Sequence, residues 1–165
     1  ERKKLFEIGH PSLVMEELNE GMRIVKHPSN EKYVFPDELN YSQFPDIAMT
    51  FAMLLPAIGC EQIKFKGLHS LKYKECNREQ ATIEHLTKIG VDMKSQDNLW
   101  LMDASNYELK NDTLFNTYHD HRMAMCVAPL SLIKPIRIEE DSVVKKSYPN
   151  FWKDLENIGF EIEYL

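Results

Sequence analysis

One local pattern occurs three times along the chain, and it limits the folds open to this sequence. Each copy is an amphipathic run that ends in Ile-Gly and continues into an alternating segment, at residues 3–16, 81–94 and 151–164. A glycine after the last helical turn is a common left-handed helix cap, and alternation of apolar and polar residues is typical of a strand. The glycines at positions 9, 90 and 159 are 81 and 69 residues apart. This spacing predicts a repeated structural unit.

The repeat extends upstream of the last two glycines. Two segments open polar and continue apolar almost all round, which predicts helices buried on every side. Each precedes an alternating segment that predicts a strand, and then a basic stretch that predicts a turn. We therefore expect an α+β fold built from repeats. The buried helices cover residues 44–59 and 119–134, the strands 60–68 and 134–141, and the basic turns 70–79 and 142–150, with a further strand at 98–103.

The length of the chain favours one domain over residues 1–165, because about 100 to 200 residues is the usual domain size. Residues 1–33 read as the tail of one repeat, 34–110 as a second repeat and 111–165 as the last one. The chain opens inside a run that reads as the end of a helix. We therefore interpret it as a piece of a longer protein.

The charge and the cysteines exclude several classes of function. A net charge of −6 would repel nucleic acid and anionic membranes, so we expect neither as a partner. No stretch approaches the roughly 18 apolar residues of a membrane span. Three widely spaced cysteines predict reduced thiols and a cytoplasmic protein. His119 and His121 lie close together, but no second cluster supplies further zinc ligands, so we expect no metal.

Cations stand where two helices are expected to begin. Asp120 is a suitable N-cap, which places His121 and Arg122 in the first turn of the next helix. Asn77 is expected to cap a second helix that has Arg78 in its first turn. Each cation costs about 0.3 to 1 kcal/mol against the helix dipole, and a bound anion reverses that sign. These helix starts therefore favour a negatively charged neighbour.

A third helix start carries the same signal. Ser147 is expected to cap a helix at residues 148–159, with Lys146 just before the cap. Taken singly, each cation reads as an exposed side chain and His121 as a structural histidine. The recurrence at matched positions favours an anion site, because equivalent turns of successive repeats tend to lie on one face of the molecule.

Two carboxylates lie in the same neighbourhoods. Asp46 is at the start of the first apolar helix, and Glu75 lies among Lys72, Lys74 and Arg78. From position alone, an acid at a helix start is a favourable dipole interaction. Carboxylates in a cationic pocket are also the usual means of moving protons in reactions of anionic substrates. Both interpretations remain open on the residues alone.

Four motifs follow one another along the chain: PDIAMT at 45–50, LKYKECNRE at 71–79, YHDHRMAM at 118–125 and KKSYPNFW at 145–152. In this order they resemble the EPSP synthase family, the 3-phosphoshikimate 1-carboxyvinyltransferases, from about residue 5 onward and within its C-terminal lobe. The resemblance implies two lobes, each an inside-out barrel of three βαβαββ units. It also implies a monomer without cofactors that serves the shikimate pathway of aromatic amino-acid biosynthesis and is inhibited by glyphosate.

The implied reaction moves the enolpyruvyl group of phosphoenolpyruvate to the 5-hydroxyl of shikimate 3-phosphate and releases phosphate. Asp46 then matches the proton acceptor at that hydroxyl, and Glu75 matches the carboxyl group that exchanges a proton with the methylene carbon of phosphoenolpyruvate. Ser70 and Lys74 correspond to further contacts with shikimate 3-phosphate. The implied phosphoenolpyruvate contacts are Arg78, Arg122 and Lys146, with His121 as a supporting neighbour.

The sequence departs from the family pattern in three ways. Asn77 stands where the family usually has Asp, and Ser70 stands where Asn is common. The N-terminal lobe, which supplies further substrate contacts in the family, is not in the chain, so we expect that lobe as a partner and the chain alone to be inactive. The alternatives are a module that binds a phosphorylated anion without chemistry, an enzyme similar to UDP-N-acetylglucosamine enolpyruvyl transferases, and a purely structural repeat domain.

Overall fold

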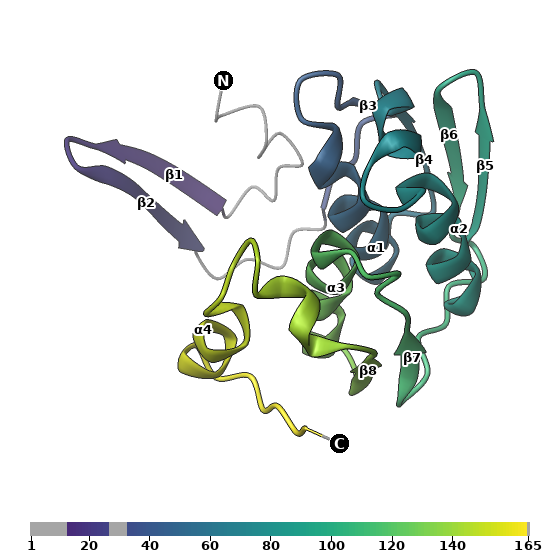
Figure 1. Cartoon of the computed structure of the whole chain (residues 1–165). Helices are drawn as coiled ribbons and strands as arrows, with labels where there is room; N and C mark the ends of the chain where they lie inside the picture. The colour runs from purple at the N-terminus through teal and green to yellow at the C-terminus, as the bar shows by residue number, and fades with distance from the viewer. Residues whose placement is uncertain (1–12, 27–32, 165) are drawn as a thin grey trace.

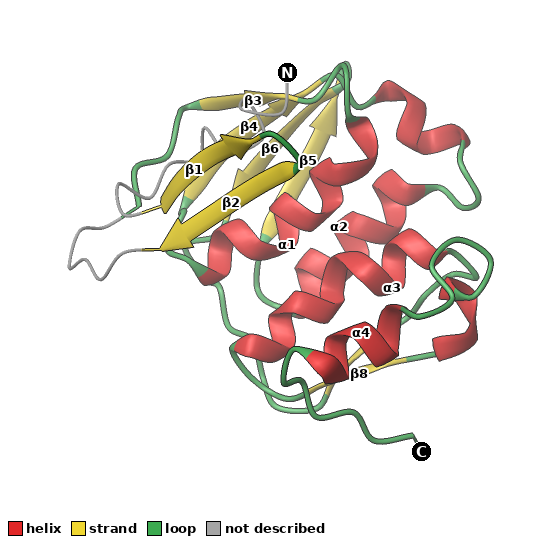
Figure 2. Ribbon diagram, turned by 90° about the vertical axis from the view of Figure 1, so that its left-hand side faces the viewer, coloured by secondary structure: helices red, strands yellow, loops and turns green. Residues whose placement is uncertain are grey.

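The structure is a computed structural model that describes residues 13–26 and 33–164. It contains a four-stranded mixed sheet covered by helices, a two-stranded parallel sheet and a separate hairpin (Figure 1, Figure 2). This arrangement confirms the expected α+β class. The helix predicted before Gly9 lies outside the described residues. Within them, no helix combines the length and apolar character needed to cross a membrane.

The largest sheet contains β3 (Glu38–Asn40), β4 (Gln62–Lys66), β5 (Asp92–Gln96) and β6 (Leu99–Asp103), in the order β3-β4-β6-β5. β3 and β4 run parallel, whereas β6 is antiparallel to both of its neighbours. Alternation in β4 buries one side of the strand and exposes the other. The predicted strands at 60–68, 98–103 and after Gly90 are therefore confirmed.

Two helices lie against this sheet (Figure 2). α1 (Ala48–Ala57) follows a 3-10 turn at Pro45–Ile47, and α2 (Arg78–Lys88) follows another at His69–Tyr73. α1 buries side chains on nearly every side, as its apolar sequence predicts, because it packs against α2 and against α3 (His121–Val127). The side chain of Asn77 accepts a hydrogen bond from the amide of Gln80, which confirms the predicted N-cap.

The C-terminal part of the chain begins with the same order of elements as the part described above. β7 (Thr113–Phe115) and β8 (Ile136–Ile138) run parallel and are joined through α3 (His121–Val127), which continues as a 3-10 turn at Ala128–Leu132. α4 (Phe151–Asn157) follows. Thus the elements from β3 to β6 run strand, helix, strand, helix, strand, strand, and those from β7 to α4 run strand, helix, strand, helix.

The hairpin of β1 (Leu13–Leu18) and β2 (Gly21–Lys26) is antiparallel and projects from the body of the molecule in Figure 1. Residues 19 and 20 form its turn, and Gly21 begins β2. The alternation predicted after Gly9 therefore does form a strand over the residues that the structure describes.

Two expectations at the C-terminal end are wrong. Residues 160–164 form no strand, because no neighbouring segment within the described chain pairs with them. Ser147 does not cap α4, which begins at Phe151 without a side-chain cap. The amides of Ser147 and Tyr148 instead bond the carbonyl of Val144, so a turn occupies this stretch. Lys146 therefore lies five residues before α4 rather than at its start.

Gly90 ends α2 with φ of +72°, and a Cβ there would collide with the backbone carbonyl of Asn106. We expect Gly90→Ala to lower the free energy of unfolding by more than the about 1 to 2 kcal/mol of a left-handed alanine. Gly59→Ala is the control, because Gly59 also has positive φ but open space around it. Urea unfolding of both variants measures the difference, and equal losses would contradict the predicted collision.

His85 of α2 is fully buried beside the rings of Phe115 and Tyr118. Burial, and then Lys88, lower its pKa to about 4. An unfolded histidine has a pKa of about 6.5, so the unfolded state binds the proton first as the pH falls. The stability that neutral His85 gives is thus complete above pH about 6.5 and is lost as the pH falls toward 4.

We expect the free energy of unfolding to drop by about 2 kcal/mol more in the wild type than in His85→Phe between about pH 7.5 and pH 5. Urea unfolding at the two pH values measures it. Carboxylates titrate in both proteins, so the comparison isolates the histidine. Parallel pH profiles of the two proteins would show that His85 is not the group responsible.

Candidate active site

A buried guanidinium lies at the centre of the candidate site. Arg78 is only 2% exposed, and its side chain is hydrogen-bonded to three carboxylates. It binds Asp120 through two nitrogens, with Nε 2.7 Å from Oδ2 and Nη2 3.1 Å from Oδ1. Nη1 donates to Oδ1 of Asp46 at 2.8 Å, and Nη2 to Oε2 of Glu75 at 2.6 Å. Carboxylates of the chain itself therefore surround this cation, and its predicted contact with a bound anion remains a prediction.

These groups come from the starts of three helices. Arg78 is the first residue of α2, Asp46 belongs to the turn before α1, and Asp120 is the N-cap of α3. Glu75 lies in the bend before α2. Asp120 also accepts a hydrogen bond from the amide of Arg122 at 2.9 Å, which confirms the predicted cap. One ion-paired cluster therefore fixes the N-terminal ends of α1, α2 and α3 next to one another.

Asp120 is fully buried but remains an anion at neutral pH. Burial alone would raise its pKa, but hydrogen bonds from Arg78 and from the amide of Arg122 outweigh burial and lower it. The thiol of Cys76 lies 3.5 Å from Asp120 Oδ2. Burial, followed by the charge of Asp120, raises the pKa of Cys76 to about 12. Cys76 is thus a protonated thiol beside the carboxylate.

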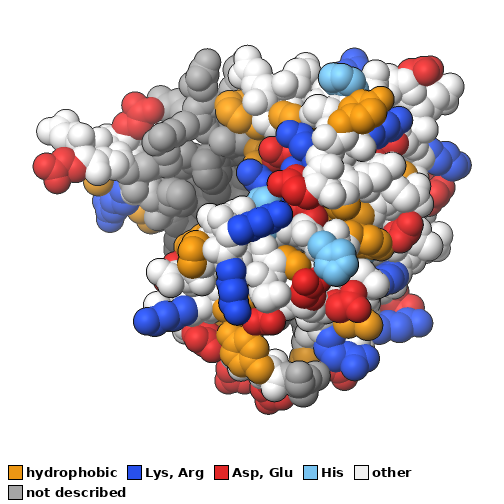
Figure 3. Space-filling view, viewed as in Figure 1, with side chains coloured by type: hydrophobic (Ala, Val, Ile, Leu, Met, Phe, Trp, Pro, Cys, Tyr) orange, Lys and Arg blue, Asp and Glu red, His pale blue; other side chains and the backbone are white. Residues whose placement is uncertain are grey.

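Two further cations lie at the open edge of this cluster. Lys74 Nζ is 3.5 Å from Asp46 Oδ1, and Arg122 Nη2 is 3.9 Å from Asp46 Oδ2. The side chains of Asp46, Lys74 and Arg122 are 30%, 31% and 39% exposed, in contrast to buried Arg78. At the centre of the face in Figure 3, positive and negative side chains are intermixed and form no large patch of one charge. The exposed edge is where a ligand can reach the cluster.

The remaining predicted residues lie around this edge. Ser70 is half-buried in the 3-10 turn before Lys74. His121 is buried, its Nδ1 is 3.6 Å from Asp120 Oδ1 without a hydrogen bond, and burial lowers its pKa. Lys146 is exposed just after the turn at Asp141–Val144, which packs against α3. Among described residues, Lys146 has no ion pair with the cluster, so its inclusion in the site remains a prediction.

One group of side chains has the spacing of a metal site. Glu75, Asp120 and His121 offer ligand atoms within 4.8 Å of one another, and they are the one such set in the described part of the chain. The Arg78 guanidinium already binds both of these carboxylates. A metal cation would therefore have to compete with a resident positive charge.

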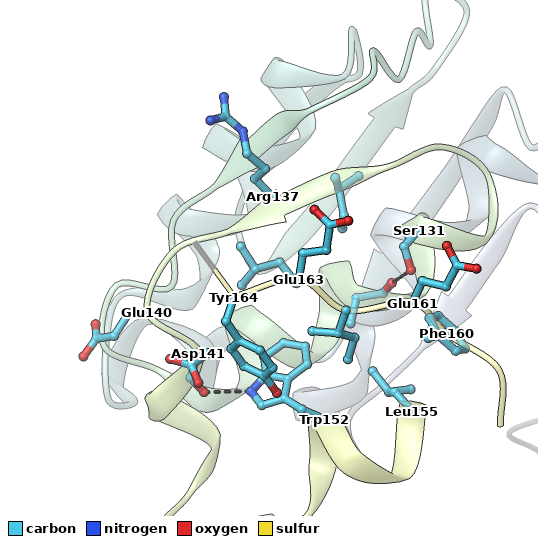
Figure 4. A pocket seen from close by; sticks show the side chains of 14 residues that line it. Ser131, Arg137, Glu140, Asp141, Trp152, Leu155, Phe160, Glu161, Glu163 and Tyr164 are labelled. Atoms are coloured by element: carbon cyan, nitrogen blue, oxygen red, sulfur yellow. Dashed lines mark hydrogen bonds between the residues drawn. The ribbon is translucent and has the colours of Figure 1, made fainter. Parts of the chain in front are cut away.

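A separate cavity of about 360 Å³ lies between α4, β8 and the C-terminal residues (Figure 4). Apolar and aromatic side chains such as Trp152 and Phe160 line it, and none of the predicted site residues does. Its charged lining consists of one arginine and four carboxylates. This balance disfavours an anionic ligand, so the cavity is not the predicted site. The full charged set is Arg137, Glu140, Asp141, Glu161 and Glu163.

Sequence reasoning missed the tertiary role of Asp120. Its sequence context predicts a helix cap only, and nothing local indicates that it binds an arginine 42 residues away. The contact between Cys76 and Asp120 was also missed, because cysteines without a motif read as small buried hydrophobes. These contacts could be predicted only from the fold, because it is the fold that brings the starts of α2 and α3 together.

Comparisons with known proteins identify the class. The family model for EPSP synthase (3-phosphoshikimate 1-carboxyvinyltransferase) matches residues 3–155. A 3-phosphoshikimate 1-carboxyvinyltransferase of Bacteroides fragilis is 34% identical over 145 residues, which cover 87% of this chain and 34% of the relative. The enzyme of that name from Clostridium novyi is 35% identical over 123 residues, or 73% of this chain and 28% of the relative. The chain belongs to the EPSP synthase family.

The fold agrees with this assignment. The structure of EPSP synthase from Acinetobacter baumannii superposes with a TM-score of 0.67 at 21% identity, over 97% of this chain and 39% of that one. At this identity the match bears on the fold alone. The chain spans about a third of the length of the curated relatives it matches.

We expect Arg78→Met to lower the free energy of unfolding by about 3 to 5 kcal/mol, because it leaves Asp120 buried without its partner. Arg23→Met is the control, since Arg23 pairs with Glu16 at 3.2 Å on the exposed hairpin. That exposed pair is expected to contribute less than about 1 kcal/mol. Urea unfolding compares the two variants. A small loss for Arg78→Met would contradict the structural role of the cluster.

Proposed function

We propose that this chain is the C-terminal lobe portion of an enzyme that transfers the enolpyruvyl group of phosphoenolpyruvate to the 5-hydroxyl of shikimate 3-phosphate. The observation that carries the proposal is the convergence of Asp46, Glu75, Lys74 and Arg122 around Arg78. These residues come from three of the four family motifs, and they meet at one open edge. Family membership supports the same reaction.

We propose Asp46 as the base. It is partly exposed, and its Oδ1 faces Arg78 and Lys74 while its Oδ2 faces Arg122. A hydroxyl that donates to Asp46 would lose its proton as its oxygen bonds to C2 of phosphoenolpyruvate. The neighbouring cations orient the carboxylate and hold the anionic substrate in reach, which lowers the entropic cost of the encounter.

We propose that Glu75 exchanges a proton with the methylene carbon of phosphoenolpyruvate. Its carboxylate is 39% exposed and bonds Nη2 of Arg78. We propose that the carboxylate of phosphoenolpyruvate takes this place on Arg78 when it binds, which releases Glu75 toward the methylene carbon. Addition then requires a proton at C3, and elimination of phosphate requires its removal, so one carboxyl group can serve both steps. Ser70, Lys74, Arg122, His121 and Lys146 keep the binding and supporting roles predicted from the motifs.

The balance of charges in the cluster supports the proposal that this chain carries only part of the active site. Three carboxylates, Asp46, Glu75 and Asp120, face three cations, Lys74, Arg78 and Arg122. This balanced set offers little net attraction to two phosphorylated substrates. We propose that further cations come from an N-terminal lobe, and that the chain alone is inactive. Calorimetry on the 165-residue chain is expected to give weak or absent binding, whereas tight binding of one phosphorylated ligand would favour a binding module without chemistry.

The proposed architecture is a single domain, residues 1–165, of repeated βαβαββ units in an inside-out barrel lobe. Residues 34–110 would be one unit, 111–165 the last unit and 1–33 the tail of another. The matching order of elements from β3 and from β7, each with a parallel strand pair joined through a helix, supports this division.

In the enzyme completed by its N-terminal lobe, we expect Asp46→Asn and Arg122→Ala each to lower phosphate release at least about 100-fold. The first removes the base, and the second removes a cation that gathers phosphoenolpyruvate. Asp92→Asn is the control, because Asp92 is an exposed strand residue with only a surface pair to Lys94. A coupled phosphate assay measures turnover. Near wild-type rates in both site variants would exclude the assigned roles.

A further inference from the structure

Glu79 lies beside Arg78 at the start of α2, but its carboxylate has different partners. The indole nitrogen of Trp100 donates to Oε2 at 3.0 Å, and Nζ of Lys72 lies 3.2 Å from Oε1. The Glu79 side chain is 11% exposed, Trp100 is fully buried in β6, and Lys72 is 41% exposed. One nearly buried carboxylate therefore joins the sheet, α2 and the 3-10 turn at His69–Tyr73.

The backbone of the segment that contains Lys72 makes few hydrogen bonds, and its other fixed points are side-chain contacts of Lys74, Glu75 and Cys76 with the Arg78 cluster. Leu71 is fully buried, and its amide bonds the carbonyl of Leu68. Beyond it, the amides of Lys74, Glu75 and Cys76 make no backbone hydrogen bond within the described part of the chain. Side-chain contacts must then set where this segment lies. It is the segment that carries Ser70, Lys74 and Glu75 of the candidate site.

The bond to Trp100 fixes where the carboxylate lies. A buried carboxylate needs donors around it, because an unpaired one costs several kcal/mol. Trp100 cannot follow a moving loop, since it is fully buried in β6, where it pairs with Phe65 of β4 and Ser95 of β5. Lys72 is the partly exposed partner and comes to the carboxylate. The ion pair of Glu79 with Lys72 therefore ties residues 70–75 to the sheet through Trp100.

We propose that Glu79 is a positioning residue for the candidate site, acting through Lys72 on residues 70–75. This inference rests on the proposed function, because it assigns Glu79 a part in placing Ser70 and Lys74 for shikimate 3-phosphate and Glu75 for proton exchange. Within the described part of the chain, Glu79 has no hydrogen bond or ion pair with any of the three. Its loss changes the position of the loop and leaves Arg122 and Lys146 in place.

The kinetic test uses the enzyme completed by its N-terminal lobe. Glu79→Gln retains an acceptor for Trp100 but loses the ion pair, and Lys72→Met loses the same pair from the other side. We expect each to raise KM for shikimate 3-phosphate roughly 10-fold and to lower kcat, with KM for phosphoenolpyruvate within about 2-fold. The double variant is expected to match the single ones, and Lys72→Arg and the surface control Asp92→Asn to stay near wild type.

A second measurement does not depend on turnover. Hydrogen exchange at the amides of residues 71–73, in the 3-10 turn, is expected to be faster in Glu79→Gln and Lys72→Met, with α1 peptides unchanged, since α1 reports general unfolding. Faster exchange in all peptides would mean a merely structural role and would overturn the proposal. So would an unchanged KM for shikimate 3-phosphate, or additive effects in the double variant. If the wild type shows no turnover, the proposed function fails and the exchange data alone decide on Glu79.

Discussion

The buried guanidinium of Arg78 is the interaction on which the rest of the structure depends. It neutralises Asp120, which is fully buried, and it also binds Asp46 and Glu75 at the open edge. A charge this deep is stable only if every partner is in place. The partners come from the starts of α1, α2 and α3. The same ion pairs therefore hold these helices together and set the geometry of the candidate site.

The same arrangement explains why cations can stand at helix starts. Arg78 begins α2 and Arg122 lies in the first turn of α3, where the helix dipoles disfavour them. Carboxylates of the chain offset this cost around Arg78, whereas Arg122 and Lys74 remain partly exposed beside Asp46. The buried cation stabilises the fold, and the exposed ones stay available to a substrate. In the proposed enzyme, the carboxylate of a ligand would replace Glu75 on Arg78, next to the exposed cations Arg122 and Lys74.

Local features of the fold were predictable, and tertiary ones were not. The apolar run of α1, the caps at Asn77 and Asp120 and the strand after Gly90 follow from residues close in sequence. The alternation at residues 160–164 predicted a strand, but a strand needs a partner that the described chain does not provide. The pairing of Arg78 with Asp46 and Asp120 joins residues 32 and 42 positions apart, which no local pattern encodes. The family motifs named the site residues without their mutual contacts.

The most direct test of this account is a nitrogen-15 NMR spectrum of the arginine side chains, with Arg78→Met to assign the Arg78 signals. A guanidinium held by Asp120, Asp46 and Glu75 cannot rotate freely or exchange its protons quickly with water. The account predicts separate, slowly exchanging Nη signals for Arg78 at neutral pH. A single averaged Nη signal, like that of an exposed arginine, would contradict it.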